Sequence, residues 1–209
     1  MYYIHEKERG MSFTHTNQDI VLENERVLLR SLEAADVQHL LPFSLYEPEL
    51  WLYSLTTAAS ESNLRQYITT ALEARAAGRE LPFIVFDKKQ NRYAGATRFY
   101  DIQLAQQNTQ LGYTWYGKAF QGTGLNRHCK FLLLQFAFET MGMMRVEFRA
   151  DARNARSIAA MKAIGCVPEG VLRSNGFRAD GSRRDSMILS ILKGEWEAGV
   201  KELLLGKLQ

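Results

Sequence analysis

The sequence predicts one α/β domain with a mixed, mostly antiparallel central sheet that is flanked by helices. Its 209 residues, 46% hydrophobic and 23% charged, have the size and composition of an ordinary globular domain. Along the chain, the spacing of hydrophobic residues switches several times between the alternation of a strand and the period of a helix. The sequence contains no internal repeat or proline-rich linker, so a single sheet with helices on its faces is expected.

The N-terminal part of the chain predicts an extension, a strand and a short helix. Residues 1–18 are expected to form a loosely held N-terminal extension. Alternation over residues 26–32 predicts a strand, and helical spacing within residues 33–43 predicts the helix that follows. Pro42 and Pro48 are expected to interrupt the next segment, a loop rich in aromatic residues.

Residues 60–115 predict a helix and then three strands. Ser60 or Ser62 is suited to cap the helix and Gly78 to end it. Its apolar residues recur at helical spacing, namely Leu64, Tyr67, Ile68, Ala71 and Leu72. The strand-like segments that follow are residues 81–87, 92–104 and 109–115, and the first two are joined by the turn composition Lys-Lys-Gln-Asn.

The second half of the chain predicts alternating helices and strands. The pattern indicates, in order, a helix at 125–141, a strand at 145–151, a helix at 154–165, a hairpin at 169–192 and a helix at 195–207. Asp180-Gly181 is the expected hairpin turn. The domain is predicted to span residues 19–196, followed by a helical tail at 197–209. Leucines 203 to 205 on that tail could pack on a second subunit, which would make a homodimer.

The composition argues against several classes of protein and site. A net charge of +3 is too small a surplus to indicate binding to nucleic acid. No apolar run has the length of a membrane span, and the charged N-terminus lacks the apolar core of a signal peptide, so a cytoplasmic protein is expected. Two cysteines and four histidines show neither a disulfide framework nor metal-ligand spacing, so no metal site is predicted.

A glycine-rich segment, Gln121-Gly122-Thr123-Gly124-Leu125-Asn126, lies between a predicted strand and the long helix. The first N–H groups of a helix lack intrahelical partners, glycines let a ligand approach closely, and the helix dipole favours an anion. The two familiar phosphate-binding patterns are absent, because there is no Walker lysine and Arg127 stands where the third glycine of G-x-G-x-x-G belongs. A phosphate-binding loop and an ordinary tight turn are both compatible with this segment alone.

This segment resembles the acyl-CoA-binding loop of the GNAT acetyltransferases, whose pattern is Q/R-x-x-G-x-G/A. Gln121 and Gly124 match the pattern, whereas Asn126 departs from the small last residue. A second GNAT signature, a strand leading to a helix with N-x-x-S, is matched at Asn154 and Ser157. The resemblance implies the GNAT fold, with two splayed central strands, and acetyl-CoA as the co-substrate.

The resemblance runs over residues 26–196 and is closest to the branch that acetylates the N-termini of ribosomal proteins. Segments of the form D-x-R-N-x-R-S and E-G-x-L-R recur in that branch, and here they begin at Asp151 and Glu169. The implied activity is transfer of acetyl to a primary amine by direct attack. The acceptor would be a protein N-terminus or a small-molecule amine, with no role for nucleic acid or membrane.

By resemblance, the coenzyme would lie between the strands at 109–115 and 145–151. Backbone groups around Thr114, Trp115 and Tyr116 would pair with the pantetheine arm. The glycine-rich segment begins at Gln121 and would bind the pyrophosphate through its backbone amides, which belong to Gly122, Thr123, Gly124, Leu125 and Asn126. Asn154 would hydrogen-bond the pantetheine arm, although asparagine is equally suited to cap the helix. Arg127, Lys130 and Arg156 could assist with phosphate charge, but a solvated helix face is the favoured interpretation.

The reaction requires a neutral amine and a proton for the departing thiolate. Neutralising an α-amino group at pH 7 costs about 1.4 kcal/mol and a lysine about 4.6 kcal/mol, so an N-terminal amine needs only a weak base. The tyrosine that many GNAT enzymes place four residues before the helix-ending glycine is replaced here by Met161. Ser157 is the predicted partner of the thiol and Asp151 the predicted base; Glu147, Asp101 and Tyr113 are further candidates for the base.

The missing tyrosine leaves a second hypothesis open, a non-catalytic domain that binds or senses acyl-CoA. Aromatic residues between 43 and 53 could line an acceptor pocket or simply pack the first helices on the sheet. The hairpin arginines could attract an acidic acceptor or a partner subunit, or be exposed without a function; they are Arg173, Arg178, Arg183 and Arg184.

Overall fold

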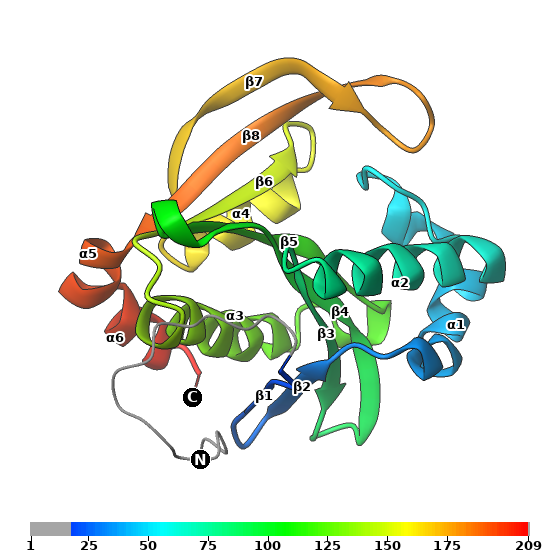
Figure 1. Ribbon diagram of the computed structural model, residues 1–209, viewed down its shortest axis with the longest axis horizontal. Coiled ribbons are helices and arrows are strands. Elements are labelled where there is room, and N and C mark those ends of the chain that lie inside the picture. Colours follow the sequence, from blue (N-terminus) through cyan, green and yellow to red (C-terminus); the bar gives the residue numbers. More distant parts are fainter. Residues whose placement is uncertain (1–17, 209) are drawn as a thin grey trace.

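The structure, a computed structural model, describes residues 18–208 and is built on one eight-stranded sheet. The strand order is β1-β2-β3-β4-β5-β6-β8-β7 (Figure 1). The strands are β1 (Val21–Glu23), β2 (Val27–Ser31), β3 (Leu81–Asp87), β4 (Arg92–Gln103), β5 (Asn108–Tyr116), β6 (Arg145–Asp151), β7 (Val167–Phe177) and β8 (Arg183–Leu192). All neighbours are antiparallel except β5 and β6. The predicted mixed, mostly antiparallel sheet is therefore confirmed.

The parallel pair β5 and β6 is joined over only a short stretch. Asn108, Thr109 and Gln110 pair with Arg145, Val146 and Glu147, and pairing stops there. Both strands continue beyond this joint, β5 to Tyr116 and β6 to Asp151. Because the strands diverge, each leaves an unpaired backbone edge toward the other, which confirms the predicted splay.

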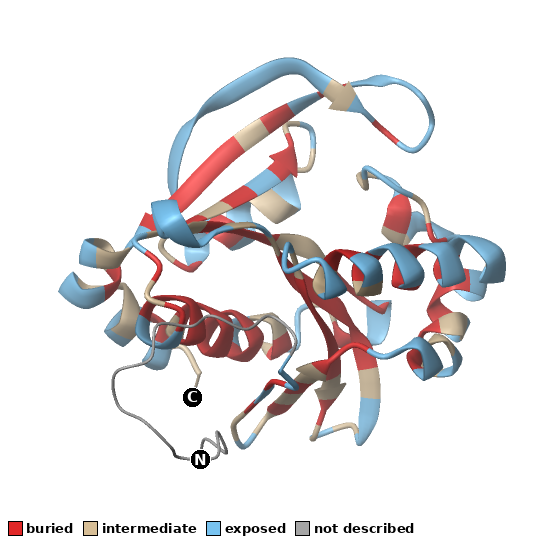
Figure 2. Cartoon of the chain, in the orientation of Figure 1, coloured by how far each residue is buried: buried red, intermediate tan, exposed pale blue. Residues whose placement is uncertain are grey.

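Helices cover the sheet on both sides (Figure 1). The helices are α1 (Val37–Tyr46), α2 (Glu61–Ala76), α3 (Leu125–Gln135), α4 (Ala155–Ala163), α5 (Lys193–Glu195) and α6 (Lys201–Leu205). Helices α1 and α2 pack on each other and on β4 and β3, while α3 packs on β1, β2 and α6. Figure 2 shows that α3 is buried around most of its circumference, whereas α2 is buried on one side only.

Several local signals in the sequence determine the element boundaries as expected. The Ser60 hydroxyl accepts a hydrogen bond from the Asn63 N–H (3.1 Å) and so caps α2. Gly78 follows α2 with a φ of +73°, a conformation that favours glycine. The hairpin of β7 and β8 turns at Asp180-Gly181, where the Asp180 carboxylate accepts from the Ser182 N–H (2.9 Å).

Tertiary packing changes the first predicted helix. Residues 34–36 form a single 3-10 turn, α1 then runs to Tyr46, and Pro42 lies inside it instead of interrupting a loop. Proline has no backbone N–H, so the helix loses one hydrogen bond at Pro42. The helix forms nevertheless because it buries Leu40 and Phe43, and the Phe43 ring packs edge-on against Trp115 (5.8 Å).

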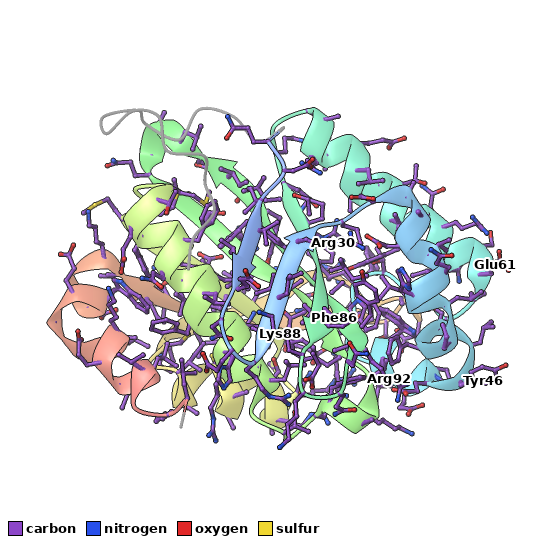
Figure 3. All side chains as sticks on the ribbon, turned by 90° about the horizontal axis from the view of Figure 1, so that it is seen from below. Arg30, Tyr46, Glu61, Phe86, Lys88 and Arg92 are labelled. Carbon is purple, nitrogen blue, oxygen red and sulfur yellow. The ribbon has the colours of Figure 1, made fainter. Side chains whose placement is uncertain are left out.

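Arg30 fixes the entry into this helix. Its guanidinium pairs with Asp36 (2.5 Å) and lies over the Tyr93 ring (5.4 Å). Figure 3 shows Arg30 on β2 and Phe86 on the neighbouring strand β3. Sequence alternation alone also missed strand β1, which is only three residues long and pairs with β2.

The long helix and the last helix are also more broken than predicted. Helix α3 is regular to Gln135 and continues as a π-helical turn at Phe136–Thr140 before Gly142. The last helix is interrupted at Gly199. Leu204 is completely buried in the core of its own chain, so it is not available to a second subunit as proposed from the sequence.

Two predictions concern the ends of the chain and its environment. The predicted extension lies outside the described residues except for residue 18. Within residues 18–208, none of the helices has the length and apolar character needed to cross a membrane.

Candidate active site

The divergence of β5 and β6 opens into a cavity of about 1130 Å³. Its walls come from the open ends of the two strands, the glycine-rich loop after β5, the start of α4, the loop of residues 49–56 after α1, and the β7–β8 hairpin. Most of the residues predicted to bind a coenzyme line this one cavity, as do Asp151 and Ser157. Thr123 and Leu125 are not among the lining residues.

The glycine-rich loop has a backbone that suits an anion. Gly122 and Gly124 have φ angles of +74° and +86°, which disfavour residues with a Cβ atom. Among the described residues, no acceptor receives a hydrogen bond from the backbone N–H groups of residues 122–126. The Thr123 hydroxyl donates to the Phe120 carbonyl (2.8 Å) and holds the loop closed behind these amides. Several N–H donors are thus free at a helix N-terminus.

Gln121 braces the loop instead of pointing to a ligand. Its side-chain amide donates to the Tyr116 carbonyl (2.8 Å), and its oxygen accepts from the Arg156 guanidinium (2.6 Å). These two bonds link the loop to the end of β5 and to α4. The side chain therefore ties together the two sides of the cavity mouth.

The open edge of β5 presents alternate residues to the cavity. The Gly117 N–H donates to the Ala94 carbonyl, so the backbone of Gly117 and of Trp115 two residues earlier faces β4. Thr114 and Tyr116 accordingly direct their backbone groups toward the gap. The structure thus separates the three residues predicted to pair with pantetheine. The backbone of Trp115 is used within the sheet, while its ring packs edge-on against Trp51 (5.0 Å).

Helix α4 begins with the second predicted pair. The Asn154 side-chain oxygen accepts from the Ser157 N–H (3.0 Å), so Asn154 does cap the helix. Its side-chain NH₂ group has no hydrogen-bond partner among residues 18–208 and remains free to donate into the cavity. The Ser157 hydroxyl is half-buried and is likewise unpaired within that range.

Asp151, the predicted base, is held in a dense network of hydrogen bonds. One carboxylate oxygen accepts from the Arg178 Nε (2.5 Å) and the other from the Arg153 N–H (2.9 Å). Burial alone would raise the pKa of Asp151, but these bonds and the arginine charges lower it below the usual carboxyl value. A carboxylate with a low pKa has little affinity for a proton, so this geometry favours a positioning role.

Comparison with known proteins agrees with this architecture. The acetyltransferase (GNAT) domain pattern matches residues 26–167. The chain belongs to the GNAT acetyltransferase family.

Several bacterial proteins are similar to this GNAT acetyltransferase. YdaF of Bacillus subtilis (strain 168), named as a ribosomal N-acetyltransferase, is 27% identical over 180 residues, covering 83% of this chain and 95% of YdaF. A structure from T. thermophilus described as an acetyltransferase is 32% identical with a TM-score of 0.82, covering 95% of this chain and all of that one. Mycobacterium smegmatis RimJ, in complex with CoA-disulfide, shares the fold at 19% identity and a TM-score of 0.76, covering 90% and 93%. These relatives do not favour the hypothesis of a non-catalytic sensor.

The other candidate bases of this GNAT enzyme differ in their surroundings. Glu147 is paired with Arg145 and Arg149 and does not line the cavity. Asp101 and Tyr113 do line it, and both have positive φ angles, +49° each, at irregular points of β4 and β5. Such backbone strain in a residue other than glycine is common at functional sites.

Three basic residues of this GNAT enzyme, two of them in the cavity wall, are more buried than the sequence interpretation favoured. Lys130 was expected on a solvated helix face, but it is only 5% exposed and donates to the Thr114 hydroxyl (2.9 Å). Burial lowers the pKa of Lys130 to about 8. Arg178 and Arg184 lie inward, whereas Arg183 is exposed on the same hairpin. One signal for the burial of Lys130 was available in the sequence. After His128 almost every residue of the helix is apolar, which indicates a helix that is buried on all sides.

The aromatic residues between 43 and 53 have different surroundings: some pack in the core and some line the cavity. Phe43 and Trp51 are buried against Trp115, and Tyr46 is 79% exposed. Of the predicted aromatic set, Trp51 and Tyr53 line the cavity. Cys129 is buried, which raises the pKa of its thiol to about 12.

A substitution separates the structural role of Asp151 from a catalytic one. We expect Asp151→Asn to lower the melting temperature at pH 7, because the buried Arg178 loses its carboxylate partner. Since the folded-state pKa is lowered, this stabilisation is complete above the ordinary carboxyl pKa and lost as pH falls below it. The melting temperatures of the two proteins should therefore differ by a similar amount at pH 7 and pH 5 and approach each other at pH 3.

The matched control is Asp19→Asn, which removes an exposed partner of Arg75 and should change the melting temperature little. A loss of turnover in Asp151→Asn with an unchanged melting temperature would contradict the positioning role.

Proposed function

We propose that this GNAT enzyme transfers acetyl from acetyl-CoA to a primary amine by direct attack, without an acyl-enzyme intermediate. We assign the activity to residues 19–196 and its setting to the cytoplasm. The observation that carries the proposal is the row of unpaired N–H groups at residues 122–126, which opens onto the gap between β5 and β6. A diphosphate is the anion whose size and charge suit several convergent amides at a helix N-terminus.

The same cavity supports the rest of a coenzyme. The Thr114 backbone and the Tyr116 N–H at the open edge of β5 can pair with the polar groups of a pantetheine arm, as an added strand would, while the Tyr116 carbonyl accepts from Gln121. The free NH₂ group of Asn154 lies on the other side of the gap and can donate to a pantetheine carbonyl. These contacts would orient the thioester toward Ser157.

The proposed chemistry places modest demands on side chains. The amine nitrogen attacks the thioester carbon, the carbon–sulfur bond breaks, and the amine loses one proton while the thiolate gains one. The Ser157 hydroxyl is placed to donate a hydrogen bond to the departing sulfur, whose pKa resembles that of a cysteine thiol. An α-amino acceptor gives up its proton to water or to Asp101 at little cost.

The acceptor class rests on two supports. The α-amino group is the cheapest amine to neutralise at pH 7, and the relative YdaF is named for ribosomal acetylation. A protein N-terminus or a small α-amine is therefore the acceptor that we propose.

A thiol-release assay tests the function. Purified protein is mixed with acetyl-CoA and a panel of amines that includes peptides with free N-termini, and free thiol is measured with time. We expect release that depends on the amine and a kcat that falls roughly tenfold in Ser157→Ala, the effect of losing one hydrogen bond to a charged group.

The control variant Ser62→Ala lies on the exposed start of α2 and should leave kcat unchanged. The affinity for CoA, measured by calorimetry, should be the same in all three proteins. If CoA binds but no amine releases thiol, the transferase proposal is wrong.

A further inference from the structure

Arg184, which neither the family motifs nor the proposed coenzyme contacts use, lies in the wall of the cavity on the β7–β8 hairpin. It is on β8, where it pairs with Gly176 of β7, and beyond the last residue of β6. Tyr53, Tyr100 and Tyr113 line the cavity together with it. None of these residues belongs to the glycine-rich loop or to the coenzyme contacts proposed above, so this part of the wall is available to an acceptor.

The surroundings of Arg184 leave its charge without an anion. The side chain is only 5% exposed. Its Nε donates to the Ser186 hydroxyl (3.0 Å) and its Nη1 to the Tyr53 carbonyl (3.3 Å), both neutral acceptors. Within residues 18–208, Nη2 has no hydrogen-bond partner, and no carboxylate forms an ion pair with this guanidinium. Burial lowers the pKa of Arg184, which reflects the cost of an unbalanced buried cation.

The other buried arginines, unlike Arg184, each pair with a carboxylate. Arg98 pairs with Glu80 (2.6 Å) and Arg178 with Asp151 (2.5 Å). Asp151 is the carboxylate whose charge acts most strongly on Arg184, yet both of its oxygens already accept hydrogen bonds from other residues. Two further carboxylates line the cavity: Asp101 accepts from the Gln110 side chain (2.8 Å), and Glu49 pairs with Lys118. Each of these carboxylates is engaged by other residues, and none of them forms an ion pair with Arg184 within residues 18–208.

We propose that Arg184 binds a carboxylate carried by the acceptor, so that the preferred acceptors are amines that also bear a carboxylate. This inference rests on the proposed function and specifies its substrate class. A guanidinium and a carboxylate form short, charge-assisted hydrogen bonds. Because only one nitrogen of one arginine is free, a singly charged carboxylate suits the site better than a phosphate, which recruits several cations. The carboxylate comes from an amino acid or from an acidic side chain near a peptide N-terminus.

Matched acceptors test the inference. Glycine is compared with glycinamide, and a short peptide with aspartate at its second position with the same peptide carrying asparagine. We expect the carboxylate member of at least one pair to have the higher kcat/KM, by roughly tenfold or more. The pair that shows the preference identifies the source of the carboxylate.

The variant Arg184→Gln should abolish that preference while turnover of the neutral acceptor and the affinity for CoA stay within about twofold. Arg149→Gln is the matched control, since Arg149 lines the same cavity but is exposed and paired with Glu147. It should retain the preference. Equal losses in both variants would show a general effect of positive charge and overturn the inference.

A binding measurement decides the question independently of turnover. N-acetylglycine and N-acetylglycinamide, which resemble products and carry no amine, are added to the CoA-saturated protein. N-acetylglycine alone should raise the melting temperature of the wild type, and neither should raise that of Arg184→Gln. Should Arg184→Gln fail to fold, Arg184→Lys replaces it and should keep part of the shift. Equal shifts from the two probes on the wild type overturn the inference, whereas absence of thiol release with every amine overturns only the proposed function.

Discussion

Replacing Gly122 and Gly124 together by alanine is expected to weaken CoA binding on the order of 100-fold. Both residues have positive φ angles, a conformation that costs residues with a Cβ about 1–2 kcal/mol each. An added Cβ would meet no atom within 4 Å at either position, so the substitution introduces no clash within the protein. The loop would relieve the backbone strain by rotating its amides away from the anion. Calorimetric titration with CoA measures the loss.

The control is the pair Gly142→Ala and Gly181→Ala, made together. These glycines also have positive φ angles, +70° and +81°, and equally open surroundings, but neither lines the cavity. The control should lose similar stability and keep its affinity for CoA. An unchanged affinity in the Gly122/Gly124 variant would mean that the amides of this loop do not bind the diphosphate.

The second large effect concerns the buried lysine, since Lys130→Met should stabilise the protein at pH 7 by about 2 kcal/mol. Burial lowers the pKa of Lys130 to about 8 from an ordinary value near 10.4, which corresponds to roughly 3 kcal/mol. Loss of the hydrogen bond to Thr114 removes about 1 kcal/mol of that gain. Methionine fills a similar volume without a charge.

The pH dependence gives the sign of this effect. Between pH 8 and pH 10.4 the unfolded chain binds more protons at this lysine than the folded protein, so the stability of the wild type rises with pH across that window. The advantage of Lys130→Met is therefore complete below pH 8 and disappears by about pH 10.5. Urea unfolding of both proteins at pH 7 and pH 10 measures the difference.

Lys162→Met, an exposed substitution on α4, should show little change at either pH. If Lys130→Met is less stable than the wild type at pH 7, Lys130 has a stabilising partner, and the interpretation as a costly buried charge is wrong.

The sequence was sufficient for the features that depend on local patterns. Alternation predicted β3 and β6 to the residue, and the glycine-rich loop was placed correctly between β5 and α3. The hairpin turn and the Ser60 cap follow from side-chain chemistry within a few residues. Each of these signals is local, and the surrounding fold reinforces it.

The features that the sequence did not predict depend on contacts between distant segments. Lys130 is buried because α3 lies against the sheet on one side and α6 on the other. Arg178 and Arg184 turn inward because Asp151, on another strand, and Tyr53, in a distant loop, accept from them. A local sequence pattern predicts that charged residues are exposed, because their buried partners come from distant segments that only the tertiary fold brings close.

The short joint between β5 and β6 has a mechanical consequence. The sheet consists of two panels, β1 to β5 and β6 to β8, and the backbone seam between them spans three residues on each strand. A molecule bound in the open part of the gap between β5 and β6 would contact both panels and so hold them together. Release of that molecule would break its contacts with both panels, so the rigidity of the sheet depends on whether this gap is filled.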